Sequence, residues 1–286
     1  MLDRKAFSLI ELTVVITVIS ILIISVIAGQ GLVSTSALIS AKSLTKQSIV
    51  REIDGLIAWY ETSTPASIKK EEGFDNGQIT TWHDISPDSI NEKKNTLSKV
   101  ASSTVIYRKN GINNIPSIEF AGVDNAVLKL ESFWQGSLSS STILLVLQPA
   151  NLSAAEVVID SYSTNTSHIA ISPTYLRMRA SANGINANTI VASDTPHILA
   201  GYFNGNLSKF YLNDATNIAG GATINPGSNP LTGLTVGGYM TASNPEFHGY
   251  ISEIIIFNRP LKKVERIDVM SYLSKKYNIR VLNLKN

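Results

Sequence analysis

The chain has 286 residues, a formal net charge of +2 and only 16% charged residues. Because the charge is nearly balanced and the sequence contains no basic stripe, it gives no indication of nucleic-acid binding. The chain contains no cysteine, so disulfide bonds are excluded as a source of its stability.

The N-terminal part of the chain predicts a membrane anchor. Arg4 and Lys5 precede a run without charged residues from Leu12 to Ala41. Its densest part, Leu12 to Ala28, is close to the roughly 20 apolar residues that span a bilayer. The two basic residues place the N-terminus in the cytoplasm and the rest of the chain outside the inner membrane. Glu11 lies at the edge of this run, where an unpaired carboxylate is costly and needs a partner.

The residues around Glu11 carry a family resemblance. The segment Phe7-Ser8-Leu9-Ile10-Glu11, preceded by the small residue Ala6, resembles the processing segment of bacterial type IV pilins and pseudopilins. The resemblance implies that a prepilin peptidase cuts between Ala6 and Phe7, which makes 1–6 a leader peptide and Phe7 an N-methylated first residue. It also implies that Glu11 pairs with the Phe7 amine of a neighbouring subunit. Two unit charges about 4 Å apart attract each other by about 4 kcal/mol at an effective dielectric constant of 20.

Two other interpretations of this segment stay open. A charged start, an apolar core and the sequence Val26-Ile27-Ala28 are also typical of a secretory signal peptide. The apolar run would equally serve as a plain signal anchor. Neither alternative explains the position of Glu11 or the Phe-Ser-Leu sequence before it, so we favour the pilin-like interpretation.

The anchor helix is expected to continue beyond the apolar run. Residues 35–53 contain neither Pro nor Gly, and Leu38, Ala41, Ile49 and Ile53 fall on one side of a helix. Gly55 can take the left-handed conformation that often ends a helix. We therefore expect one helix over 7–54, membrane anchor and stem together, with a length of roughly 72 Å.

After Gly55 the chain reads as short strands separated by turn residues, which predicts an all-β sandwich. Asn204-Gly205-Asn206 is a strong hairpin signal between two of them. The expected strands are Leu56–Tyr60, Thr104–Arg108, Ser117–Phe120, Ala126–Leu130, Thr142–Leu147, Val157–Asp160, His168–Ser172, Tyr175–Ala180, His197–Phe203, Leu207–Leu212, Leu234–Gly237 and Glu253–Asn258. A short helix over Leu261–Lys276 follows Pro260 and closes the domain.

A second resemblance covers this region. Its landmarks, in chain order, are IAWYETS, TWHDISPDS, NGINNIPSIEFAG, FNGNLSKFYLND, LTVGGY and HGYISEIIIFNRPL. They resemble the concanavalin A-like, laminin G-like jelly roll. The expected fold class is therefore a long N-terminal α-helix followed by an all-β antiparallel jelly-roll head over 55–286, with two sheets of about six or seven strands each and the C-terminal helix over 261–276.

No pattern in the head predicts catalysis. Glycosidases on this fold usually carry two carboxylates on one strand, whereas Glu253 stands alone between Ser252 and Ile254 and reads as structural. The histidines do not form a zinc-spaced pair; they are His83, His168, His197 and His248. Trp59 and Trp82 lie in strand-like motifs and are expected in the core. The chain is therefore predicted not to be an enzyme.

Binding residues in the head are predicted from the resemblance, because lectin-like jelly rolls use loop oxygens and an aromatic platform for sugars or Ca²⁺. The candidates are Asp84, Asp88, Trp134, Asn204, Asn206, Asn213 and Asp214. Asn-Gly and Asn-Asp pairs are first of all turn formers, so each residue also has a purely structural interpretation. The resemblance admits Ca²⁺ in the head, and no other cofactor is indicated.

Together these features predict a pilin-like subunit of a type IV pilus or a type II secretion pseudopilus. Its expected partners are the prepilin peptidase, other pilin or pseudopilin subunits, the inner membrane, and a glycan or surface protein bound by the head. It would cross the bacterial inner membrane once, with the head outside, before it enters a filament. The alternative is a membrane-anchored carbohydrate-binding or carbohydrate-processing protein that does not polymerise.

Overall fold

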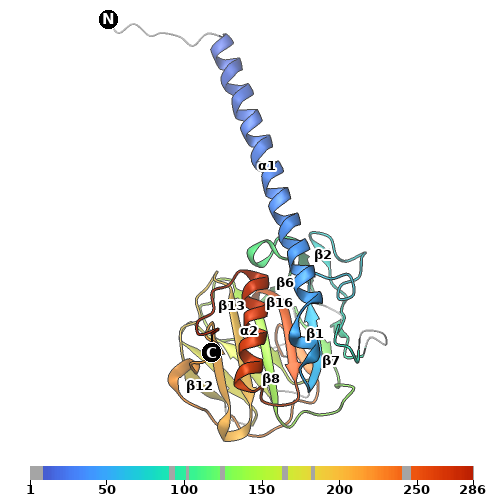
Figure 1. Cartoon of the computed structure of the whole chain (residues 1–286), viewed down its shortest axis with the longest axis vertical. Helices are drawn as coiled ribbons and strands as arrows, with labels where there is room; N and C mark the ends of the chain where they lie inside the picture. The colour runs from blue at the N-terminus through green and yellow to red at the C-terminus, as the bar shows by residue number, and fades with distance from the viewer. Residues whose placement is uncertain are drawn as a thin grey trace, which may run out of the picture.

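The computed structural model describes residues 9–89, 94–100, 103–122, 126–162, 167–181, 184–239 and 246–285. Within the first helix, the side chains of residues 24 and 26–33 are not described. The predicted leader peptide and the cleavage site at Ala6 and Phe7 lie outside the described residues. Figure 1 shows a helix that leads away from a rounded head formed by the rest of the chain.

The N-terminal helix is shorter than predicted. Helix α1 (Leu9–Lys46) ends eight residues before Asp54, and a separate 3-10 turn, η1 (Ile49–Glu52), follows it. The break occurs at Ser48, whose backbone is extended and whose hydroxyl accepts a hydrogen bond from Val50 N at 3.2 Å. Serine side chains compete with helical backbone bonds in this way. The expected single stem helix over 7–54 is therefore wrong.

The predicted membrane span is also corrected. Within the described residues, no helix is both long enough and apolar enough to cross a membrane. This finding overturns the expected transmembrane segment and the single-pass inner-membrane location that depended on it.

The head consists of two antiparallel sheets, each with eight strands in the described part of the chain. Sheet A has the order β14-β13-β8-β16-β6-β5-β2, with β1 paired to β16, and sheet B has the order β12-β11-β10-β9-β15-β7-β4-β3. The strands of sheet A are β1 (Leu56–Glu61), β2 (Gly77–Gln78), β5 (Val105–Arg108), β6 (Ser117–Ala121), β8 (Ser141–Pro149), β13 (His197–Phe203), β14 (Lys209–Leu212) and β16 (His248–Phe257). The strands of sheet B are β3 (Thr81–Trp82), β4 (Leu97–Lys99), β7 (Leu128–Leu130), β9 (Glu156–Asp160), β10 (His168–Ile171), β11 (Tyr175–Arg179), β12 (Ile185–Asn188) and β15 (Leu234–Val236).

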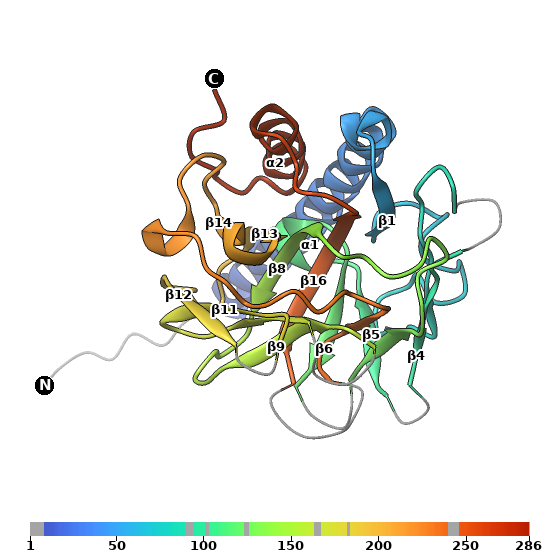
Figure 2. The same cartoon turned by 90° about the horizontal axis from the view of Figure 1, so that it is seen from below.

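Two apolar layers hold the head together, and strand β8 contributes to both. Ile143 and Leu145 point into the core between the two sheets. Leu144 and Val146 point to the opposite face of sheet A and pack with Met270 and other residues of helix α2 (Lys263–Tyr277). This arrangement explains the continuous apolar sequence of β8, because both faces of the strand are buried. The three layers are therefore α2 with the end of α1, sheet A and sheet B (Figures 1 and 2).

Helix α2 confirms the predicted C-terminal helix, beginning two residues later than expected and ending one residue later. Glu265 closes its first turn by accepting a hydrogen bond from Lys262 N at 2.7 Å. Asn278 ends the helix in the left-handed conformation, with φ of 50°.

A buried charged cluster fixes α2 to sheet A. The Lys276 ammonium donates to Glu61 Oε2 at 3.0 Å and to Glu253 Oε2 at 2.7 Å, and all three side chains are fully buried. The hydroxyls of Tyr272 and Tyr277 each donate to Glu253 at 2.8 Å. Charge-assisted hydrogen bonds are roughly twice as strong as neutral ones, so this cluster sets the position of the helix. Glu253 is thus a structural residue, as predicted.

Candidate functional site

The two aspartates proposed near Trp82 do not form a joint site. Asp84 is buried and accepts hydrogen bonds from Trp59 N at 2.8 Å, from Ser86 N at 2.8 Å and from Ser86 Oγ at 3.0 Å. Burial raises the pKa of Asp84 to about 6, against the opposite effect of these hydrogen bonds. Asp88 is exposed. Asp84 therefore organises its loop and is closed to a ligand, while Asp88 faces solvent.

Asn213 and Asp214 also serve the local backbone. Asn213 Oδ1 accepts a hydrogen bond from Ile198 N at 2.7 Å. Asp214 accepts hydrogen bonds from Thr216 N at 2.8 Å and from Asn283 Nδ2 at 2.9 Å. Asp214 thereby builds a turn and holds the C-terminal segment against it.

Trp134 is the predicted aromatic platform. Its side chain is 61% exposed, and its backbone N donates to Asn95 Oδ1 at 2.8 Å. The Lys94 ammonium lies 3.6 Å from the centre of the indole ring. A cation in this position gains from the negative face of the ring. The platform is therefore accessible in part, and its role in binding stays a prediction.

One predicted residue, Asn204, lines a hollow that joins several features of a binding site. The hollow has a volume of about 400 Å³, within the range of small-ligand sites, roughly 300–1,000 Å³. Asn206, two residues further on, is exposed and does not line it. The lining residues are Tyr202, Asn204, Leu207, Lys209, Tyr211, Thr216, Pro260, Leu261, Lys263 and Arg266. We call this hollow the Tyr202 pocket.

Strands β13 and β14 and helix α2 position the side chains of the Tyr202 pocket. Tyr202 and Tyr211 lie on neighbouring strands, with ring centres 5.4 Å apart and ring planes at 63°. Arg266 comes from α2 and places its guanidinium 3.9 Å from the centre of the Tyr211 ring. It also donates to Ala215 O at 2.9 Å and to the Tyr202 hydroxyl at 3.2 Å. The pocket is thus a fixed aromatic and basic surface at the edge of sheet A.

Sequence reasoning identified Asn204 and missed the aromatic and basic residues around it. Tyr202, Lys209 and Tyr211 stand within five residues of the predicted hairpin turn, so the alternation of the two strands could have placed them on one face. Arg266 belongs to a helix distant in sequence, and no local signal connects it with the hairpin.

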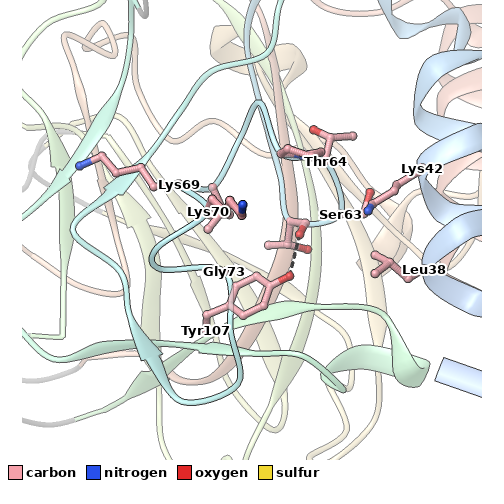
Figure 3. Close-up of a pocket in the computed structure, with 11 residues that line it drawn as sticks. Leu38, Lys42, Ser63, Thr64, Lys69, Lys70, Gly73 and Tyr107 are labelled. Carbon is pink, nitrogen blue, oxygen red and sulfur yellow. Dashed lines mark hydrogen bonds between the residues drawn. The ribbon is translucent and has the colours of Figure 1, made fainter. Parts of the chain in front are cut away.

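A second hollow, of about 330 Å³, lies between α1 and the head. Leu38 and Lys42 of α1 line one side of it, and the segment around Ser63 and Thr64 lines the other (Figure 3). The Tyr107 hydroxyl donates to Thr62 O at 3.2 Å, the dashed line in Figure 3. The remaining lining residues are Pro65, Ile68, Lys69, Lys70 and Gly73. Since α1 forms one wall, we call this hollow the junction pocket.

His168 is a buried histidine in sheet B. Its ring packs edge-on against the Tyr239 ring, with the two ring centres 5.7 Å apart. Within the described residues, neither ring nitrogen of His168 has a hydrogen-bond partner. Burial lowers the pKa of His168 to about 4, with smaller contributions from Arg179 and Arg177. The unfolded chain, with a histidine pKa near 6.5, therefore binds a proton between about pH 6.5 and 4 that the folded chain does not bind.

This difference predicts a loss of stability in acid. The contribution of His168 to the free energy of unfolding is fully present above about pH 6.5 and falls by up to about 3 kcal/mol as the pH approaches 4. We expect His168→Gln to reduce the fall between pH 7 and pH 4, as measured by urea unfolding at each pH. An identical pH dependence in the variant and the wild type would contradict this assignment.

No group of three or more His, Asp or Glu residues in the described part of the chain is placed to hold a metal ion. The Ca²⁺ admitted by the sequence stays a prediction.

Comparisons with known proteins show the fold of the head. A scan against protein-family models and a search of curated proteins find no match. Among solved structures, domain 4 of a GH43 extracellular arabinanase from Geobacillus stearothermophilus, in complex with arabinotriose, matches with a TM-score of 0.50 and 17% identity, over 75% of this chain and 97% of that one. The binding domain of Paraclostridial Mosquitocidal Protein 1 matches with a TM-score of 0.53 and 12% identity, over 78% of this chain and 52% of that one.

A third solved structure, of botulinum neurotoxin type C, whose cell entry depends on two ganglioside molecules, matches with a TM-score of 0.50 and 14% identity, over 82% of this chain and 52% of that one. This chain thus spans about half of the length of the two toxin chains. The head is a β-sandwich of the jelly-roll type.

Proposed function

We propose that the chain is a pilin-like subunit of a type IV pilus or a type II secretion pseudopilus. Copies assemble through α1, and the jelly-roll head recognises a carbohydrate or a surface protein without enzymatic activity. The proposal rests on one observation above all, the exposed apolar surface of α1.

This surface covers most of the circumference of the first part of α1. Its exposed apolar residues are Leu9, Ile10, Leu12, Val14, Val15, Ile16, Val18, Ile19, Ile21, Leu22 and Ile23. Consecutive helical residues point in directions 100° apart, so apart from Glu11 this run leaves only a narrow polar stripe of Thr13, Thr17 and Ser20. The hydroxyls of these three residues donate to backbone carbonyls of α1 itself. A helix that is apolar over most of its circumference is normally buried against other elements. Burial among other α1 helices would gain about 25 cal/mol for each Å² removed from water.

In the part of the chain that the structure describes, the head contacts the last turns of α1 and not the apolar first part. Ala41 is buried in the layer between α2 and sheet A, and Thr45 Oγ1 lies 3.3 Å from the Tyr272 hydroxyl. These contacts hold the last turns of α1 on the head, while the first turns extend from it (Figure 1). A helix with one end held on the head and an apolar other end suits assembly of many copies side by side.

The processing segment supports the same proposal. Glu11 lies in the first turn of α1 with its side chain exposed, four residues after Phe7. Cleavage after Ala6 would create an amine on Phe7, and an assembly would bring this amine to the Glu11 carboxylate of another copy. The pairing compensates both charges inside an apolar contact, where one alone would be costly.

Mass spectrometry and one substitution test this proposal in cells that contain a prepilin peptidase. We expect a mature chain that begins at N-methylated Phe7. Glu11→Ala should still be processed but should lose assembly, because the Phe7 amine loses its partner, whereas Glu52→Ala, an exposed glutamate in η1, should assemble normally. A mature chain with another first residue, or full assembly of Glu11→Ala, would refute the proposal.

A second candidate function is carbohydrate binding by a chain that does not polymerise. The Tyr202 pocket favours it, since it combines aromatic rings with polar side chains, and the arabinanase domain with a similar fold was solved with arabinotriose. Retention of sugar binding by a chain that stays monomeric at all concentrations would favour this second function over the first.

A further inference from the structure

We propose that the Tyr202 pocket binds a saccharide unit that carries a carboxylate. The inference deepens the recognition role proposed for the head and rests on it, but it does not depend on assembly through α1. It assigns both a site and a class of ligand.

The charge of the pocket selects an acidic ligand. Lys209, Lys263 and Arg266 line it, and no acidic residue is among its described lining residues. The nearby acid, Glu265, is held by Arg259 through two bonds of 2.8 Å. Such a bidentate pair satisfies the carboxylate of Glu265. The three cations therefore give the pocket a positive charge that attracts an anionic ligand.

Arg266 is built into the pocket in a way that suits a carboxylate. Only 5% of the residue is exposed, and Ala215 O and the Tyr202 hydroxyl fix its orientation. Two of its five N–H donors have these partners, which leaves others to a ligand. A planar guanidinium matches the geometry of a carboxylate and loses little freedom when it is already held in place.

The other walls suit the ring and the hydroxyls of a sugar. Tyr202 and Tyr211 offer aromatic surface beside the cations, and Asn204 adds an amide that can donate and accept. Leu207 is 56% exposed at the rim. Burial raises the pKa of Tyr202 to about 12, so its hydroxyl stays neutral and does not repel an anion.

Binding of defined saccharides to the full chain tests the inference. The probes are 3′-sialyllactose and digalacturonate, which carry a carboxylate on different sugars, and lactose, which carries none. We expect both acidic probes to bind at least tenfold more tightly than lactose, with affinity that falls as salt rises. The double variant Lys209→Gln/Lys263→Gln should lose at least tenfold in affinity for the acidic probes.

The junction pocket provides the matched control. Lys69→Gln/Lys70→Gln removes two lysines from that hollow and should leave binding unchanged. Because Arg266 also supports the fold, Arg266→Lys is compared with wild type by thermal unfolding, and weaker binding at unchanged stability supports its role. Equal binding of lactose, no binding of any probe, unchanged binding by the double variant, or loss of binding in the control would overturn the inference. Failure of the chain to assemble would refute the proposed assembly and leave this inference standing.

Discussion

Replacing Lys276 by methionine is expected to lower the free energy of unfolding of the head by about 3–5 kcal/mol. The variant keeps most of the apolar stem of the side chain but removes the ammonium that both Glu61 and Glu253 contact. Two buried carboxylates then lose their counter-charge in a site closed to water. Burial alone would raise the pKa of Glu61, but Lys276 and several hydrogen bonds hold this pKa below its usual value. The Glu61 carboxylate is therefore charged at neutral pH in the wild type.

Urea unfolding at pH 7 measures this loss, and the neighbouring lysine supplies the control. Lys275 is exposed on the same helix, so Lys275→Met should change stability by no more than about 0.5 kcal/mol. Equal stability of the two variants would mean that the buried cluster does not hold α2 in place.

The second large effect concerns α1. Ile19→Asp is expected to weaken self-association of the processed chain at least tenfold. An unpaired carboxylate between packed helices carries a penalty of several kcal/mol, and about 1.4 kcal/mol already corresponds to a factor of ten. Sedimentation velocity over a range of protein concentrations measures the change.

A matched substitution on the head separates this effect from the added charge itself. Phe74 is an exposed apolar residue of the head, so Phe74→Asp adds the same carboxylate without touching α1. It should associate as the wild type does. Association that is unchanged by Ile19→Asp, or equally weakened by Phe74→Asp, would count against contacts through α1.

Several elements of the head could be predicted from sequence because their signals are local. Strand β13 begins at His197 and ends at Phe203, where its apolar run and the Asn204-Gly205 turn placed it. Trp59 and Trp82 are fully buried, as their strand-like motifs indicated. The strands that escaped prediction are short: β2 and β3 have two residues each, β4 has three and β12 has four. Their pairing with other strands defines them, rather than a local apolar pattern.

The end of α1 was mispredicted because a side chain outweighed the apolar pattern. Ile49 and Ile53 continue the helical spacing of the preceding residues, but the hydroxyl of Ser48 bonds the backbone of Val50 and starts a new turn. Spacing alone does not show this competition.

The candidate site was predicted only in part, because the roles of its polar residues depend on contacts that residue spacing does not show. Asp84, Asn213 and Asp214 are polar loop residues, and the fold uses them to satisfy nearby backbone groups. The Tyr202 pocket depends on Arg266, which reaches the hairpin only because α2 packs on sheet A. Such a juxtaposition follows from tertiary packing, so a single sequence gives no sign of it.

Electron cryomicroscopy of the assembled, processed chain tests the central claim, assembly through α1, most directly. We expect α1 helices to pack against one another along the centre of the assembly, with axes about 8–10 Å apart, and the jelly-roll heads to lie outside. Assemblies held together by the heads, with the first turns of α1 exposed, or a processed chain that stays monomeric, would contradict it.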